Sequence, residues 1–128
     1  MITILTTPRA ANCFIGGGLS GLMHSMLYAT AGSETEAVRI ATHLLRKRLI
    51  ACANIFPIRS LYRWKGRISD EKEFAIVMKT RKTLVLKAIE EAAKVHSYEV
   101  PCLVSYDTSK GLPEYMKWID EQTTSRGR

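Results

Sequence analysis

Several features that would classify a chain at once are absent or scarce in this sequence. Its 128 residues contain no apolar run of the ~18 residues that a membrane-spanning helix needs. The three cysteines, Cys13, Cys52 and Cys102, are odd in number and widely spaced, so we expect reduced thiols in the cytoplasm rather than a disulfide framework. Three scattered histidines, with no Gly-x-Ser-x-Gly motif and no paired catalytic carboxylates, argue against an enzyme.

The basic charge of the chain raises the question of a nucleic-acid partner. The formal net charge is +7, from 19 Lys and Arg against 12 Asp and Glu. Part of this excess lies at residues 46–48, the end of a predicted helix, where cations suit the helix dipole. No helix-turn-helix, zinc-finger or RNA-binding signature is present, so we expect no nucleic-acid partner.

Residues 1–25 differ in composition from the rest of the chain. They carry one basic residue, Arg9, and no acid, and four glycines interrupt any regular element. A secretory signal with a small-residue cleavage site at 29–31 is the alternative, but the glycines dilute its apolar core. We predict a disordered extension over residues 1–25, a folded domain over residues 26–122 and a tail over residues 123–128.

The folded part begins with a strand, a helix and a second strand. Residues 25–31 form a short apolar run that ends at Gly32, which predicts a strand. Ser33 and Glu36 form a capping box, and the apolar spacing that follows predicts a helix to about Arg48. Residues 50–55 predict the second strand, which is interrupted near Pro57.

The remaining elements complete a β-α-β-β-α-β order. The second strand resumes over residues 58–68, and a polar turn at residues 69–71 follows. Residues 73–79 return as a strand that is apolar on both faces, so it is either a central strand or covered by a partner. A helix over 82–96, a strand over 98–106 and a short helix after Pro113 end the chain. This order predicts an α/β ferredoxin-like fold, with two helices on an antiparallel sheet.

The hairpin over residues 58–79 is longer than this minimal fold requires. If the first strand runs unbroken over 58–68, its side chains alternate between two faces. Four basic residues and Leu61 then share one face, and Ile58, Tyr62, Trp64 and Ile68 share the other; the basic residues are Arg59, Arg63, Lys65 and Arg67. Because exposed aromatic patches usually mark interfaces, we predict self-association through this hairpin.

Several segments together resemble the CutA divalent-cation tolerance family. They are residues 49–55 (LIACANI), 59–66 (RSLYRWKG), 78–81 (MKTR), 96–101 (HSYEVP) and 115–119 (YMKWI). The resemblance covers about residues 26–122 and implies a homotrimer assembled through the long hairpins. It also implies a response to metal ions, with copper or another divalent cation as the bound ion, and an architecture similar to that of the trimeric PII signalling proteins.

The copper ligands that the resemblance implies are only partly present. The family's first-strand cysteine is similar in position to Ala29, and its two adjacent histidines are similar to Val95 and His96. Of the family's three ligand positions, only the one at His96 is therefore retained. Cys102 and Cys52 are the soft ligands that remain to complete a site. Each residue has a structural alternative: His96 as a helix C-terminal residue, and both cysteines as small buried side chains.

Three hypotheses follow. In a metal-binding homotrimer, His96 and a cysteine converge. In a PII-like regulatory trimer, clefts between subunits bind a small anion through basic side chains beside aromatic and acidic ones. The residues expected at this interface or cleft are Arg59, Tyr62, Arg63, Trp64, Lys65 and Glu99. The third hypothesis is a docking trimer without a ligand, in which Tyr62 and Trp64 are subunit contacts.

Overall fold

The computed structural model of the chain describes residues 23–124. The predictions for residues 1–22, including Cys13, and for residues 125–128 therefore lie outside the described residues. Its elements are β1 (His24–Ala31), α1 (Glu34–Arg46), β2 (Cys52–Trp64), β3 (Arg67–Arg81), a 3₁₀ turn (Lys82–Leu84), α2 (Val85–Val95), β4 (Leu103–Asp107) and α3 (Pro113–Gln122). This order confirms the predicted succession of strands and helices. His24 and Ser25 belong to β1 rather than to the extension.

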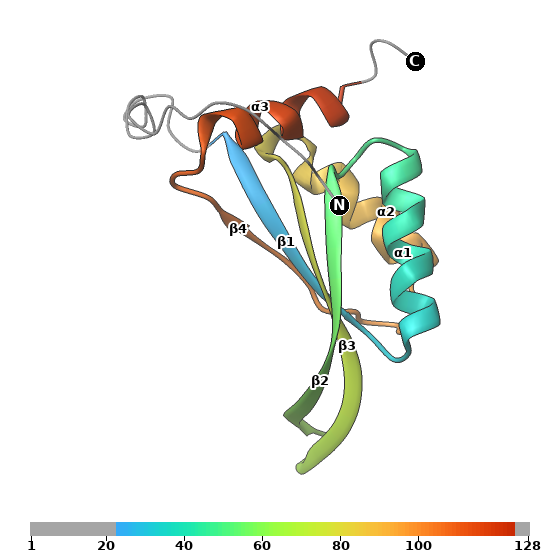
Figure 1. Cartoon of the computed structure of the whole chain (residues 1–128). Coiled ribbons are helices and arrows are strands. Elements are labelled where there is room, and N and C mark those ends of the chain that lie inside the picture. The colour runs from blue at the N-terminus through green and yellow to red at the C-terminus, as the bar shows by residue number, and fades with distance from the viewer. Residues whose placement is uncertain (1–22, 125–128) are drawn as a thin grey trace.

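One antiparallel sheet in the order β2-β3-β1-β4 carries the fold, so β3 is a central strand, the first of the two predicted alternatives. Helices α1 and α2 cover one face of this sheet, and the paired ends of β2 and β3 project beyond them, away from α3 (Figure 1). The core lies between the sheet and the two helices. Its largest side chains are fully buried, among them Leu27, Ile40, Leu44, Ile76 and Met78.

The start of α1 is fixed by a cap that also reaches a distant segment. Ser33 is the N-cap, and its Oγ accepts a hydrogen bond from the backbone N–H of Glu36 at 3.1 Å, as the capping box predicts. The Glu36 carboxylate accepts a hydrogen bond from the backbone N–H of Ser97 at 2.7 Å, so the glutamate is directed to another part of the fold. The second contact ties the first turn of α1 to the segment that precedes β4.

The predicted turn of the hairpin was wrong by several residues. Strand β2 continues through Pro57 to Trp64, and the chain reverses at Lys65 and Gly66, which have φ angles of 49° and 78°. A two-residue hairpin loop with positive φ at both positions matches the twist of the strands, and glycine adopts it without steric cost. Pro57 is accommodated because β2 is an edge strand.

This turn changes the predicted side-chain faces. Trp64 pairs with Arg67, and Arg63 pairs with Ile68. Because paired residues share a face of the sheet, Arg67 lies with Trp64, whereas Ile68 lies with Arg63. The predicted basic face of four residues is therefore limited to Arg59 and Arg63, because Lys65 lies in the turn and Arg67 has changed sides.

The last strand is shorter than predicted. It begins at Leu103, whereas the sequence predicted strand structure from residue 98. The backbone N–H of Tyr98 donates a hydrogen bond to Nδ1 of His96 at 3.0 Å, and Pro101 has no backbone N–H to give. Residues 98–102 therefore form a connection that crosses the end of β1.

Replacing Gly66 by alanine tests the turn. A Cβ at a φ of 78° is strained, and we expect Gly66→Ala to lower the free energy of unfolding by about 1–2 kcal/mol. Lys65→Asn is the matched control, because asparagine tolerates a positive φ, and it should leave stability unchanged or slightly higher. Urea unfolding at one fixed protein concentration measures both. Equal effects of the two substitutions would contradict the assigned turn.

The acid stability of the helix layer depends on Glu91. His43 donates a hydrogen bond to this carboxylate and Lys94 a second, and they lower the pKa of Glu91 to about 2. The folded pKa is below the unfolded value of about 4.3, so this stabilisation is complete above that value and disappears as the pH falls toward 2. We expect the free energy of unfolding of Glu91→Gln to depend less on pH in this window than that of the wild-type chain. The control variant Glu90→Gln changes an exposed neighbouring residue. Its free energy of unfolding should depend on pH as in the wild-type chain.

Candidate functional site

The face of the sheet opposite α1 and α2, here called the open face, carries exposed apolar side chains. Strand pairing places Phe56 and Thr30 on either side of Ala75, and places Val104 beside Tyr28, all on this face. The apolar side chains on it that are largely exposed are Phe56, Tyr62, Trp64, Val104 and Tyr106. A surface of this kind is uncommon on a monomer and typical of a binding surface.

A cavity of about 900 Å³, here called the open-face pocket, lies between the hairpin, β1 and residues 98–102. Four of the six residues predicted for an interface or cleft line it: Arg59, Tyr62, Trp64 and Glu99. The other two predicted residues, Arg63 and Lys65, are not part of its lining. The ammonium group of Lys65 lies 5.8 Å from the ring centroid of Trp64.

Two tyrosine–glutamate pairs define the chemistry of the open-face pocket. The Tyr98 hydroxyl donates a hydrogen bond to Glu73 Oε2 at 2.6 Å, and the Tyr62 hydroxyl donates one to Glu71 Oε1 at 3.0 Å. Burial, followed by the hydrogen bond to Glu73, raises the pKa of Tyr98 above its usual value. Glu73 and Tyr98 were not predicted as site residues. One indirect signal was visible in the sequence, the alternation that places Glu71 and Glu73 on the same face of a strand.

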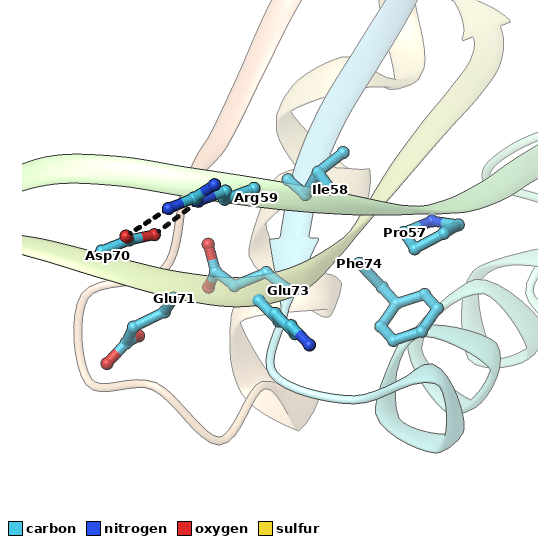
Figure 2. A pocket seen from close by; sticks show the side chains of 8 residues that line it. Pro57, Ile58, Arg59, Asp70, Glu71, Glu73 and Phe74 are labelled. Carbon is cyan, nitrogen blue, oxygen red and sulfur yellow. Dashed lines mark hydrogen bonds and ion pairs between the residues drawn. The ribbon is translucent and has the colours of Figure 1, made fainter.

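A second cavity of about 680 Å³ lies where the hairpin leaves the body of the molecule (Figure 2). Arg59 and Asp70 form a bidentate ion pair there, with N–O distances of 2.9 and 2.8 Å. The hydrogen bonds from Arg59 lower the pKa of Asp70, and Asp70 raises the pKa of Arg59. The charge of Arg59 is thus already balanced within the chain.

His96 is buried and both of its ring nitrogens are engaged. Nε2 donates a hydrogen bond to the carbonyl oxygen of Thr30 at 2.8 Å, and Nδ1 accepts one from the backbone N–H of Tyr98 at 3.0 Å. The imidazole therefore carries its proton on Nε2, and neither nitrogen has a free lone pair for a metal ion. In this arrangement, His96 connects β1 to the segment that lines the open-face pocket.

The two described cysteines lie in different parts of the fold. Cys102 lines the open-face pocket. Cys52 lies at the start of β2, with its sulfur 3.4 Å from the Tyr115 hydroxyl and 3.9 Å from Nζ of Lys79. Within residues 23–124, no three His, Cys, Asp or Glu side chains are grouped so that they could hold a metal ion. The convergence of His96 with a cysteine therefore stays a prediction.

The reactivity of Cys102 tests the surroundings of the open-face pocket. Burial, and then the nearby charge of Glu73, raise the pKa of the Cys102 thiol. The parent chain for this test has Cys13 and Cys52 replaced by serine. We expect its rate of iodoacetamide alkylation to reach half of the maximum at a pH above the usual thiol pKa of about 8.5. Glu73→Gln should move this midpoint only part of the way toward the usual thiol pKa, because the variant removes the charge of Glu73 but leaves the thiol buried. A midpoint at 8.5 or below in the parent chain would contradict this environment.

Comparisons with known proteins agree with the fold. Residues 25–122 match the family model described as CutA1 divalent ion tolerance protein. The chain is 46% identical over 99 residues, 77% of its length, to the divalent-cation tolerance protein CutA of Archaeoglobus fulgidus, of which the match covers 97%. It is 43% identical over 96 residues, 75% of its length, to the Thermotoga maritima protein of the same name, with 95% of that protein covered.

Solved structures give the same result. A structure described as the periplasmic divalent cation tolerance protein CutA from Archaeoglobus fulgidus aligns with a TM-score of 0.78 at 44% identity, covering 80% of this chain and all of that one. This supports the predicted ferredoxin-like fold. No helix among residues 23–124 is long and apolar enough to cross a membrane. The chain belongs to the CutA1 divalent ion tolerance protein family.

Proposed function

We propose that this chain acts in divalent-cation tolerance as a cytoplasmic homotrimer that binds metal ions and has no catalytic role. The observation that carries the assembly is the hairpin of β2 and β3, which extends beyond the helix layer with apolar side chains on both faces. Trp64 is 55% exposed on one face and Ile68 is 72% exposed on the other. An isolated two-stranded ribbon is marginally stable in water, so its length favours burial against other copies.

The edges and the open face of the sheet support the same assembly. Strands β2 and β4 are the two edges of the sheet, and each presents unpaired backbone groups that another chain can pair with. Tyr62 and Trp64 of the hairpin lie on the same face of the sheet as Phe56 and Val104. A head-to-tail contact between hairpin and open face joins two different surfaces, and such a contact gives a closed ring of three copies when each copy is rotated by a third of a turn.

For the metal-binding part of the function, the thiols are the stronger candidates among His96, Cys102 and Cys52. Thiolate is the preferred ligand type for copper(I), and the described cysteines form no disulfide. Use of His96 would require breaking its hydrogen bond to Thr30 or that from Tyr98. Since one chain groups no three ligands among its described residues, a trimer that brings three copies of one cysteine together would complete the set.

The PII-like alternative, an anionic ligand in an inter-subunit cleft, is less well supported. The open-face pocket is lined by the carboxylates of Glu71, Glu73 and Glu99. The single cationic side chain in its lining is Arg59, which is paired with Asp70. An anion would therefore meet a negative surface there.

Native mass spectrometry of the reduced, tag-free protein, with and without one equivalent of copper per chain, tests the proposal. We expect a mass of three chains of 14.4 kDa each, with copper taken up in a fixed ratio to the trimer and lost in Cys102→Ser or Cys52→Ser. A trimer that takes up no copper would contradict the metal-binding part alone. A monomer would contradict the assembly.

Substitutions on the hairpin test where the copies meet. We expect the combined Trp64→Ala and Ile68→Ala variant to raise the dissociation constant of the trimer at least tenfold, because buried aromatic side chains dominate interface energies. Leu86→Ala is the matched control, because Leu86 is 81% exposed but lies on α2, away from the hairpin. Sedimentation velocity over a dilution series measures both. If the control dissociates as readily as the hairpin variant, the interface lies elsewhere.

A further inference from the structure

Glu73 on the open face is a buried carboxylate without a cationic partner in its own chain. It is 7% exposed, and none of the ion pairs identified among residues 23–124 involves it. Its Oε2 atom accepts a hydrogen bond from the hydroxyl of Tyr98, which is a neutral group. Because removing an unpaired charge from water is costly, buried carboxylates are normally paired with a cation. The partner of Glu73 is therefore expected from outside the chain.

The basic side chains closest to Glu73 in the fold and in the sequence do not supply this partner. Arg59, the one basic residue that lines the open-face pocket, is engaged by Asp70 through a bidentate ion pair. Lys72 is adjacent to Glu73 in β3, but its side chain points to the opposite face, because side chains alternate along a strand. Two more carboxylates line the same pocket and make it attractive to a cation, those of Glu71 and Glu99.

The projecting end of the hairpin carries a cation that is free within its own chain. Arg67 pairs with Trp64 beside the turn, and both residues are exposed. In the described part of the chain, Arg67 belongs to none of the ion pairs. An even number of residues separates it from Glu73 along β3, so both side chains lie on the same face of the sheet. The six steps between them span about 20 Å, so the two cannot pair within one chain.

A head-to-tail ring brings these two groups together from different copies. In the proposed assembly, the hairpin of one copy lies on the open face of the next. The side of the hairpin that carries Tyr62 and Trp64 is apolar, so it is the side that this contact would bury. Arg67 lies on that side and enters the interface with them. Each copy then supplies one cation and one carboxylate, and the same pair repeats at every contact around the ring.

We propose that Glu73 of each chain forms an ion pair with Arg67 from the hairpin of a neighbouring copy. This inference rests on the proposed homotrimer and names the polar contact that sets its register. The Tyr98 hydroxyl restricts the orientation of the Glu73 carboxylate, and a planar guanidinium can bind such a carboxylate through two parallel hydrogen bonds. The open-face pocket of one chain is then filled by the hairpin of the next.

A double-mutant cycle on the full chain tests the pair, with sedimentation velocity over a dilution series as the measurement. We expect Arg67→Ala and Glu73→Gln each to raise the dissociation constant of the trimer at least tenfold, because each leaves a charged group in the interface without its partner. The double variant should dissociate no more readily than the weaker of the two single variants, because the pair is already lost. Arg63→Ala is the matched control, since Arg63 is exposed on the opposite face of the same ribbon, and its effect should multiply with that of Glu73→Gln.

The outcomes separate this inference from the assembly on which it rests. A wild-type trimer whose dissociation constant is unchanged by Arg67→Ala would overturn the pair and leave the homotrimer in place. The same holds if the effects of Arg67→Ala and Glu73→Gln multiply in the double variant. A wild-type chain that is monomeric at every concentration would overturn both.

Two further variants at the exposed position decide the matter should Glu73→Gln fail to fold. Arg67→Lys keeps the positive charge, whereas Arg67→Met keeps a long side chain without it. We expect Arg67→Lys to retain the trimer at concentrations where Arg67→Met has dissociated. Equal dissociation of the two variants would overturn the pair, because the contact of Arg67 would then not depend on its charge.

Discussion

The pairing of β2 with β3 is the constraint on which the remaining structure depends. All 13 residues of β2 pair with β3, from Cys52 opposite Lys79 to Trp64 opposite Arg67. Half of this ribbon lies over the helix layer and helps to build the core, and the other half projects beyond it (Figure 1). The register fixed by the two-residue turn decides which side chains of the projecting half face the open-face pocket. A slip of one residue would exchange the two faces.

The sequence predicted the elements better than their ends. Apolar periodicity identified the helix of Ile40 and Leu44 and the central strand around Ile76, because both are packed in the core. The turn was misplaced at residues 69–71 because that stretch is polar, whereas the actual turn depends on Gly66, a single residue with positive φ. In the projecting ribbon no core lies on either side, so hydrophobic alternation carries little information there. The start of β4 depended on the contact of Tyr98 with His96.

The candidate site was predicted in part. Tyr62, Trp64 and Glu99 were expected at an interface or a cleft between subunits, which stays a prediction. Within one chain they line the same cavity. The importance of Glu73 was not visible, because its burial and its contact with Tyr98 join residues 25 positions apart. His96 was predicted as a metal ligand from the family resemblance, and this stays a prediction. Within one chain, its two ring nitrogens form hydrogen bonds with Thr30 and Tyr98.

Amide hydrogen exchange along the hairpin tests the central claim, that copies of the chain cover the projecting ribbon and the open face, most directly. We expect amides of residues 58–73 to exchange slowly in concentrated protein, comparably to the core strand β1, and to lose protection on dilution as copies separate. If these amides exchange rapidly at every concentration while β1 remains protected, the ribbon is exposed to solvent and neighbouring copies do not cover it.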